Sequence, residues 1–276
     1  MAAISPLRIL ITGGARGIGR GLSRHFLSAG HSVYILDSNP LELDQINKLA
    51  DIWKPSSNQS IWKASLCDLR DRTKIKAVIE DVKDVFQGRL DVLINNAMAT
   101  EGVGAGKPME DDSDDIMNDW DTKIAVGLTA PYILSRLCIP LLEGGSSGSP
   151  GTIINISSTR AYQAEDNHEA YSSAKAGILG LTQSMSVSLG HRYKIRVNAV
   201  LPGWIHVMSE RADADAKGTK WEEGLGKDDA EWHPAGRVGK VEDIAKAVDY
   251  LISNEFVTGQ ELVVDGGVGR KMVYPE

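Results

Sequence analysis

The chain has 276 residues, of which 42% are hydrophobic and 24% are charged, and its formal net charge is −7 at pH 7. This composition favours a folded globular body over a disordered chain. The negative charge argues against a nucleic-acid or anionic-membrane partner, because both require a basic face. We therefore expect a single domain over residues 1–276 with a small-molecule substrate.

The two cysteines, Cys67 and Cys138, have no paired spacing, and the six histidines show no metal-ligand spacing. Neither a disulfide framework nor a metal site is expected, and a reducing compartment, the cytoplasm, fits best. The N-terminus lacks a basic region followed by a long apolar stretch. No run approaches the ~18 consecutive apolar residues of a membrane span, so we expect no membrane partner.

Short apolar runs bounded by turn residues alternate with longer segments of helical periodicity, which is typical of βαβ units that build a parallel sheet. The runs predict strands at 8–12, 32–36, 60–65, 92–95, 152–156, 196–201 and 261–264. The helical segments between them lie at 20–29, 41–54, 72–86, 120–142, 170–189 and 241–253. The sequence therefore predicts an α/β fold of the Rossmann type: a doubly wound parallel sheet of about seven strands with helices on both faces.

Two stretches depart from this alternation. Residues 143–151 are rich in Gly and Ser and predict a surface turn without a functional role. Residues 206–234 are longer than an ordinary connection and contain two tryptophans and many charges. We interpret this second segment as a substrate lid, with a plain loop as the alternative.

A glycine-rich run, TGGARGIG at residues 12–19, directly follows the first predicted strand and opens the first helix. Glycines are needed where the backbone turns sharply and approaches a diphosphate closely, and a helix N-terminus offers unpaired N–H groups. An ordinary glycine-rich turn is the alternative interpretation. In this context the run predicts a dinucleotide-binding loop.

The acidic residue Asp37 follows the second predicted strand. An acidic side chain there can accept both hydrogen bonds of an adenosine ribose diol, and it would repel a 2′-phosphate. Arg16, inside the glycine run, could instead pair with a 2′-phosphate, or it could be a solvated surface charge. We therefore expect NAD(H) as the favoured cofactor and keep NADP(H) as the alternative.

Candidate cofactor contacts also follow the third and fourth predicted strands. Asp68 and Leu69 come just after the third strand, where Asp68 could contact the adenine edge or simply cap a helix. Asn95 and Ala97 lie at the end of the fourth strand. Because ligands of open α/β sheets bind outside the carboxyl ends of the strands, we expect these residues beside the cofactor.

Tyr171 and Lys175 are four residues apart at the start of a predicted helix, so they share one face, and Ser158 follows the fifth strand at the same edge of the sheet. Carbonyl reduction needs a proton donor beside the oxygen, and a tyrosine of pKa about 10 is a weak base at neutral pH. An ammonium within about 4–6 Å can lower that pKa. We predict Tyr171 as general acid/base, Lys175 as the neighbouring charge that also holds the nicotinamide ribose, and Ser158 as a hydrogen-bond donor to the substrate oxygen.

With these residues in view, the chain resembles the short-chain dehydrogenase/reductase family over residues 7–270. The resemblance rests on ordered motifs: TGGARGIG at 12–19, Asp68, NNA at 95–97, Ser158, YSSAK at 171–175, RVN at 196–198, PG at 202–203 and DGG at 265–267. It implies reversible hydride transfer between a nicotinamide cofactor and a secondary alcohol or ketone. It also implies two sets of cofactor contacts: Gly13, Gly17, Ile18 and Gly19 at the diphosphate, and Pro202, Gly203 and Ile205 at the nicotinamide.

Two positions depart from the family pattern. Gly127 stands where the family usually has Asn, whose main-chain carbonyl holds a water that links the lysine to solvent, so the resemblance implies a slower proton relay here. Met98 stands where the family usually has Gly, and its side chain either intrudes near the nicotinamide or substrate or fills a gap. Because members of the family are often tetramers, we expect a homo-oligomer, a dimer or tetramer, with residues 270–276 reaching a neighbouring subunit.

The sequence leaves three functions open. The leading one is an alcohol dehydrogenase or carbonyl reductase. Gly127 and Met98 motivate a second, a regulatory protein that binds a dinucleotide without turnover, and a tailoring enzyme with a net non-redox step is the third. A polar set between Ser158 and Tyr171 borders the expected substrate mouth and favours a polar substrate: Arg160, Tyr162, Gln163, Asp166, Asn167 and His168.

Overall fold

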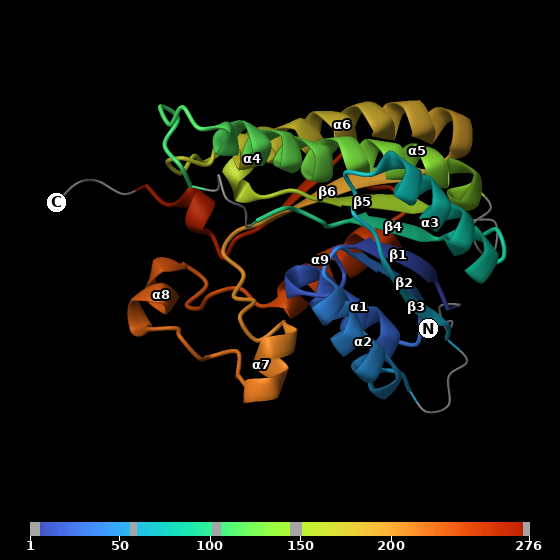
Figure 1. Cartoon of the computed structure of the whole chain (residues 1–276), viewed down its shortest axis with the longest axis horizontal. Coiled ribbons are helices and arrows are strands. Elements are labelled where there is room, and N and C mark those ends of the chain that lie inside the picture. Colours follow the sequence, from blue (N-terminus) through green and yellow to red (C-terminus); the bar gives the residue numbers. More distant parts are fainter. Residues whose placement is uncertain (1–5, 56–59, 101–105, 144–150, 273–276) are drawn as a thin grey trace.

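Parallel strands form one sheet in the computed structural model, which describes residues 6–55, 60–100, 106–143 and 151–272. Their order is β3-β2-β1-β4-β5-β6-β7 (Figure 1). The strands are β1 Arg8–Thr12, β2 Ser32–Asp37, β3 Trp62–Leu66, β4 Val92–Asn95, β5 Thr152–Ile156, β6 Arg196–Pro202 and β7 Glu261–Val264. The direction of winding reverses between β1 and β4, and such a reversal opens a crevice at the carboxyl ends of the strands.

Helices cover both faces of the sheet (Figure 1). One face carries α1 Gly17–Ser28, α2 Pro40–Trp53 and α9 Val241–Ser253. The other carries α3 Arg72–Val85, α4 Asp114–Ile124, α5 Ala130–Leu142 and α6 Glu169–Tyr193. Two short helices, α7 Ala212–Lys217 and α8 Lys227–Trp232, lie beyond the carboxyl ends of the strands. The predicted doubly wound α/β fold is confirmed.

Alternate residues of each strand face opposite layers of helices. In β1, Ile9 and Ile11 pack with residues of α1, α2 and α9, whereas Leu10 packs with residues of α3, α5 and α6. All three side chains are fully buried, and burial of such a side chain contributes about 1.5–3 kcal/mol. Because both faces of the central strands are covered, β1, β2 and β4 are nearly continuous apolar runs rather than alternating ones.

Strand bounds differ slightly from the predicted ones. The third strand is Trp62–Leu66 rather than 60–65, because its pairing with β2 begins at Trp62 and ends where Leu66 lies opposite Asp37. Both β2 and β6 extend one residue further, to Asp37 and Pro202. Both extensions point toward the crevice, so each strand delivers its last residue to the edge where a ligand would lie.

The predicted helix at 120–142 begins earlier and is not uniform. It starts at Asp114, with Asp114 and Asp115 in the first turn, where carboxylates favour the positive end of the helix dipole. A π-helical turn, Ala125–Thr129, joins α4 to α5. We call this segment the π-turn. Likewise α6 ends at Tyr193 instead of 189, with basic residues in its last turn, where the dipole favours them.

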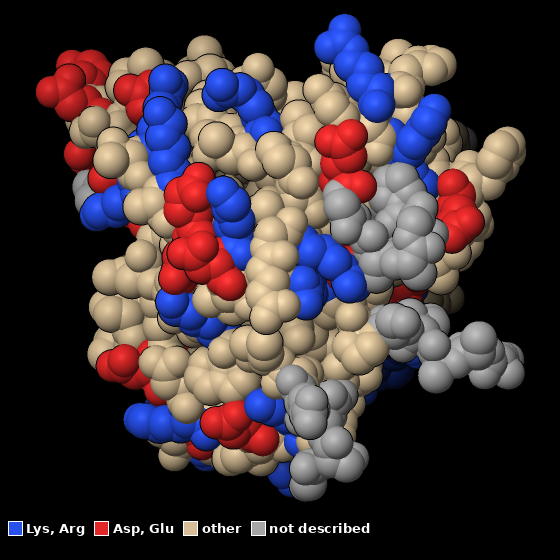
Figure 2. Space-filling model, turned by 90° about the vertical axis from the view of Figure 1, so that its right-hand side faces the viewer, with Lys and Arg blue, Asp and Glu red and all other residues tan. Residues whose placement is uncertain are grey.

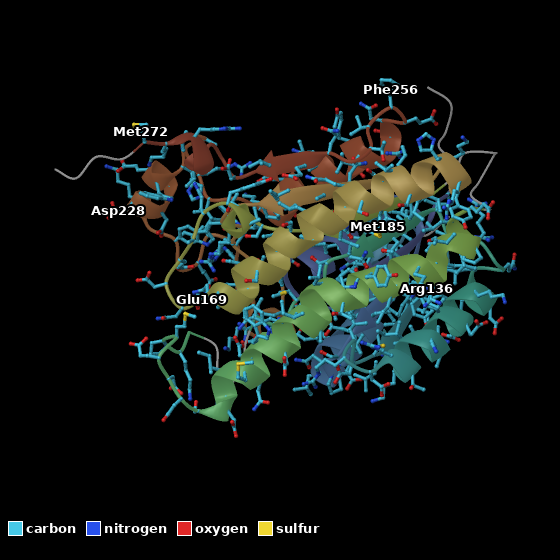
Figure 3. All side chains as sticks on the ribbon, turned by 90° about the horizontal axis from the view of Figure 1, so that it is seen from above. Arg136, Glu169, Met185, Asp228, Phe256 and Met272 are labelled. Carbon is cyan, nitrogen blue, oxygen red and sulfur yellow. The ribbon has the colours of Figure 1, made fainter. Side chains whose placement is uncertain are left out.

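One described helical stretch, Asp114–Leu142, has 29 residues and a mean hydropathy of 1.6 over 18 of them. Length and composition would let it cross a membrane, which the sequence pattern does not anticipate. In the fold it lies on the sheet alongside α6 (Figure 3), and 39% of the apolar window is buried. Buried core helices pass the same test, so the stretch is weak support for a membrane span.

The segment 206–234 is fastened to α1 at its first half. Glu210 pairs with Arg24 at 2.6 Å, and Asp215 pairs with the buried Arg20 at 2.6 Å. The backbone carbonyl of Glu210 also accepts a hydrogen bond from the N–H of Gly17, at 2.8 Å. The start of the expected lid is therefore held against the glycine loop.

Charges of both signs alternate over the face shown in Figure 2, without a single-sign field on that face. Such a surface suits solubility rather than attraction of a polyanion. Most of the predicted surface turn at 143–151, and residues 273–276 of the predicted subunit-crossing tail, lie outside the described residues.

Candidate active site

A cavity of about 630 Å³ opens at the carboxyl ends of the strands on both sides of the β1/β4 reversal. This volume is typical of small-molecule and cofactor sites. Most predicted site residues line it: Gly13, Arg16, Gly17, Ile18, Asp37, Asp68, Leu69, Ala97, Ser158, Tyr171, Lys175, Pro202, Gly203 and Ile205. Two predicted residues, Gly19 and Asn95, are not among those that line it.

The glycine run forms a tight loop between β1 and α1. Gly13 and Gly17 have φ angles of +62° and +59°, which L side chains rarely adopt. A Cβ on Gly17 would meet no atom within 4 Å, whereas a Cβ on Gly19 would lie 2.0 Å from the carbonyl oxygen of Gly13. Gly19 therefore lets the loop fold back on α1, and Gly17 leaves open space at the N-terminus of that helix, where an anion is favoured.

Asn96 is a cavity residue that the sequence prediction missed. Its Nδ2 donates to the carbonyl oxygens of Thr12 and Gly13, each at 3.0 Å, and its backbone N–H donates to Thr12 Oγ1, also at 3.0 Å. These bonds fasten the glycine loop to the end of β4. Asn96 thus acts on the shape of the loop from across the crevice.

Asn95 lies on the opposite face of β4, in the interior. Its Nδ2 donates to Asn155 Oδ1 at 2.9 Å and to Ser135 Oγ at 3.3 Å. Because side chains alternate along a strand, Asn95 shares the face of Leu93, which packs in the core with α3, α5 and α6. That alternation was readable from the sequence and would have favoured Asn96 over Asn95.

Asp37 lies in the cavity wall with both carboxylate oxygens engaged. One accepts the N–H of Ala15 at 3.1 Å and the other the N–H of Asn39 at 3.0 Å. Burial raises the pKa of this carboxyl, and these backbone hydrogen bonds and the charge of Arg16 oppose the rise. Asp37 and Arg16, which predict opposite cofactor preferences, therefore act on one another at the same end of the cavity.

Asp68 is paired in the structure with Arg70, a cavity residue that was not predicted. The Arg70 guanidinium donates to both carboxylate oxygens, at distances of 2.7 to 3.1 Å. This hydrogen bonding lowers the pKa of Asp68. Arg70 brings a second cation to the end of the cavity that holds Asp37 and Arg16.

Two hydrogen bonds tie the end of β5 to α6. Lys175 Nζ donates to the carbonyl oxygen of Ile156 at 2.8 Å, and Ser157 Oγ donates to the carbonyl oxygen of Lys175 at 2.7 Å. We call this pair of bonds the β5–α6 clasp. It brings Ser158 within hydrogen-bond reach of Tyr171, so the three residues predicted to act together do meet in the fold.

The pKa of Tyr171 is raised rather than lowered. Burial raises it, while the hydrogen bond from Ser158 and the positive charge of Arg160 act in the opposite direction. The Arg160 guanidinium lies 5.8 Å from the centre of the Tyr171 ring. The expected lowering by Lys175 is therefore not observed, because burial dominates.

Lys175 explains part of that outcome. Its side chain is 4% exposed, and its Nζ lies 5.6 Å from the centre of the Tyr171 ring. Burial lowers the pKa of Lys175 to about 8, so the ammonium has lost its proton, and with it its charge, before the pH at which Tyr171 titrates. A ligand that supplied negative charge or hydrogen bonds to Nζ would favour the charged form.

The polar set between Ser158 and Tyr171 and the segment 206–234 contribute little to the described cavity wall. Arg160 faces the Tyr171 ring and pairs with Glu165, but no residue of the predicted polar set lines the cavity. From 206–234 only Val207 lines it. Thr122 and Val126, from α4 and the π-turn, line the cavity instead. Both lie far in sequence from the motifs, so the sequence did not predict them as site residues.

Known proteins match this chain over almost its whole length. The model of a protein family described as enoyl-(acyl carrier protein) reductase matches residues 13–269. An uncharacterised oxidoreductase of Thermotoga maritima is 35% identical over 274 residues, which cover 97% of each chain. A 3-oxoacyl-(acyl-carrier-protein) reductase of the same organism is 32% identical over 262 residues, which cover 94% of this chain and 96% of the relative.

Solved structures match the fold over the same extent. An apo SCOR enzyme from Clostridium thermocellum is 33% identical, with a TM-score of 0.76 and coverage of 98% of this chain and 96% of the other. A short chain dehydrogenase from Bacillus anthracis is 29% identical, with a TM-score of 0.76 and coverage of 98% of each chain. Together with the glycine loop, the Tyr171–Lys175 pair and the seven-stranded sheet, these matches show that the chain belongs to the short-chain dehydrogenase/reductase family of oxidoreductases.

Proposed function

We propose that the protein catalyses reversible hydride transfer between NAD(P)(H) and a secondary alcohol or ketone, with Tyr171 as general acid/base. The observation that carries this proposal is that Ser158, Tyr171 and the buried Lys175 line one wall of a cavity that begins at the glycine loop. When bound, the nicotinamide supplies or accepts the hydride. Every other step belongs to side chains of this chain.

The residues present fit a dinucleotide. Gly17 leaves open space at the N-terminus of α1, which suits a diphosphate. Asp37 borders the cavity near this loop, through its bond to Ala15, as expected for a ribose contact. Tyr171 and Lys175 line the same cavity from α6, and Lys175 Nζ could hold the second ribose.

The proton chemistry follows from the hydrogen bonds. The N–H of Arg160 donates to Ser158 Oγ at 3.2 Å, and the one Ser158 hydroxyl proton, which interacts with Tyr171, donates to the substrate oxygen once that oxygen lies between the two side chains. Tyr171 then transfers its phenolic proton to that oxygen as negative charge develops there. Because the pKa of Tyr171 is raised, its protonated form dominates at neutral pH, and this form serves reduction.

We propose NAD(H) as the preferred cofactor on the strength of Asp37. Its buried carboxylate would repel a 2′-phosphate and can accept hydrogen bonds from a ribose diol. Arg16 and Arg70 line the same end of the cavity and support NADP(H) as the competing preference.

We also propose that the protein is a homo-oligomer, that 206–234 covers the substrate end, and that it works in the cytoplasm. Exposed apolar side chains on the helical layer of α4, α5 and α6 support self-association: Met117, Trp120, Tyr132 and Val187. Val207 in the cavity wall supports the lid role. Two buried free cysteines suit a reducing compartment.

Replacing Tyr171 with Phe tests the proposed acid/base. Loss of a general acid is expected to lower kcat by about 100- to 10,000-fold, while the dissociation constant for NADH, measured by fluorescence titration, stays within about twofold. Tyr250→Phe, on the half-exposed ring of a tyrosine in α9, is the control and should keep normal turnover. Turnover of Tyr171→Phe within tenfold of the wild type would show that another group supplies the proton.

Lys175→Met is expected to abolish turnover without lowering stability at pH 7. The folded pKa of about 8 lies below the usual 10.5, so a stability cost is fully present below pH 8 and vanishes above pH 10.5. Removing the ammonium therefore stabilises the variant by at most about 3 kcal/mol at pH 7. Loss of the hydrogen bond from Lys175 Nζ to the Ile156 carbonyl offsets part of that gain. Urea unfolding at pH 7 and pH 10 measures it.

The advantage of Lys175→Met over the wild type should shrink as pH rises from 7 to 10. Lys83→Met is the control, because Lys83 is a half-exposed lysine on α3 and should show no such trend. A difference in unfolding free energy that is the same at both pH values would mean that Lys175 carries no buried charge at neutral pH.

Cofactor preference is tested by thermal unfolding with saturating NADH or NADPH. A ligand that binds only the folded state stabilises it by RT ln(1 + [L]/Kd), so NADH should raise the unfolding temperature more than NADPH. Asp37→Asn, which keeps one acceptor oxygen for the backbone, should narrow the difference. A larger rise with NADPH that Arg16→Gln removes would overturn the assignment of Asp37.

A further inference from the structure

Met98 lies where the cofactor end of the cavity meets the end that holds Tyr171. It directly follows Ala97, whose backbone packs so closely on Gly13 that a Cβ there would lie 2.8 Å from Ala97 Cα. Met98 itself is half-buried and lines the cavity. Its side chain therefore leaves the glycine loop and extends toward the helices on the other side of the crevice.

The sulfur of Met98 occupies the space above Gly127. A Cβ on Gly127 would lie 2.6 Å from Met98 Sδ, 3.4 Å from Met98 Cε and 3.1 Å from the Cβ of Ala174. The first distance is shorter than real Cβ contacts. A side chain at position 127 and the observed position of Met98 therefore exclude one another.

Backbone geometry does not account for the glycine at position 127. Gly127 lies inside the π-turn and is not among the residues with positive φ, and glycine in a helix costs about 1 kcal/mol relative to alanine. The close approach of Met98 explains why position 127 is a glycine. A second close approach lies nearby, since a Cβ on Gly177 of α6 would lie 2.8 Å from Leu128 of the π-turn, so the π-turn and α6 are pressed together.

The place where Met98 is held adjoins the reacting groups. Ala174, whose Cβ lies 3.1 Å from the position of a Cβ on Gly127, immediately precedes Lys175 and lies within one turn of Tyr171. Thr122 and Val126, just before Gly127, line the same cavity as Ser158 and Tyr171. Methionine is adaptable, and the missing side chain of Gly127 gives its sulfur a position beside the π-turn.

We propose that Met98, seated on Gly127, is a specificity-determining residue that narrows the pocket beside the reacting carbonyl and selects carbonyl compounds with a small substituent on that side. This inference rests on the proposed reductase function. Because Gly127 has no side chain, the Met98 sulfur can move away from the cavity. A larger residue at 127 drives Met98 into the pocket, and a smaller residue at 98 opens the pocket.

The test is a double-mutant cycle with two ketone probes, butan-2-one and the bulkier 1-phenylpropan-1-one. Met98→Ala should raise the kcat/KM ratio of the bulky to the small ketone by about tenfold or more, since small changes in an apolar pocket discriminate by 10- to 200-fold. Gly127→Ala should lower that ratio by a similar factor. In the double variant, the ratio should return to within about threefold of Met98→Ala alone.

A readout without substrate separates this inference from the function on which it rests. Gly127→Ala should lower the thermal unfolding temperature more when Met98 is present than when position 98 is Ala, because only the closeness to Ala174 Cβ, 3.1 Å, remains in both backgrounds. Gly180→Ala is the matched control, because Gly180 is a helical glycine of α6 whose added Cβ would meet no atom within 4 Å. It should change neither the ketone ratio nor the coupling.

Two outcomes overturn the inference while the proposed function stands. One is ketone turnover with an unchanged ratio in Met98→Ala, accompanied by a tenfold weaker affinity for NADH, which would make Met98 a cofactor contact. The other is an equal effect of Gly127→Ala in both backgrounds. Absence of turnover on every carbonyl probe by the wild type instead overturns the proposed function, and the selectivity role with it.

Discussion

The β5–α6 clasp is the interaction on which the rest of the site depends. Two bonds crossing in opposite directions, Lys175 Nζ to Ile156 O and Ser157 Oγ to Lys175 O, join a strand end to the first turns of a helix. They hold Ser158, the residue after Ser157, beside Tyr171 in the cavity wall. The sheet provides the rest, since parallel strands deliver their carboxyl ends to one edge, where the glycine loop also lies.

Burying Lys175 costs stability near neutral pH, and the same burial sets the pKa values on which the proposed chemistry depends. Burial lowers the pKa of Lys175 to about 8, and it raises the pKa of Tyr171, so the site holds a protonated phenol beside a lysine that gives up its proton more readily than a free one. The core on both faces of the sheet offsets this cost. A similar compromise recurs at the glycine loop, where Gly17, with its positive φ, leaves open space at the N-terminus of α1.

Local patterns predict what depends on neighbours in sequence. Apolar runs located all seven strands, and the glycine run and the Tyr171–Lys175 spacing located two opposite parts of the cavity wall. The sequence prediction failed where the direction of a side chain or a contact between distant residues matters. Asn95 points into the core, whereas its neighbour Asn96 lines the cavity. The contact of Met98 with Gly127 joins residues on separate elements, and the pKa of Tyr171 depends on burial. Neither of these follows from spacing in the chain.

The proposed reaction transfers a hydride directly from the nicotinamide to the carbonyl carbon of the substrate. An isotope experiment can follow that hydrogen. The wild-type protein would be incubated with a ketone and NADH carrying deuterium at C4 of the nicotinamide, on one face or the other in separate reactions. The account predicts one deuterium on the carbinol carbon of the product from one of the two cofactors. An alcohol product without deuterium from either cofactor would contradict it, because its hydrogen would then have come from water.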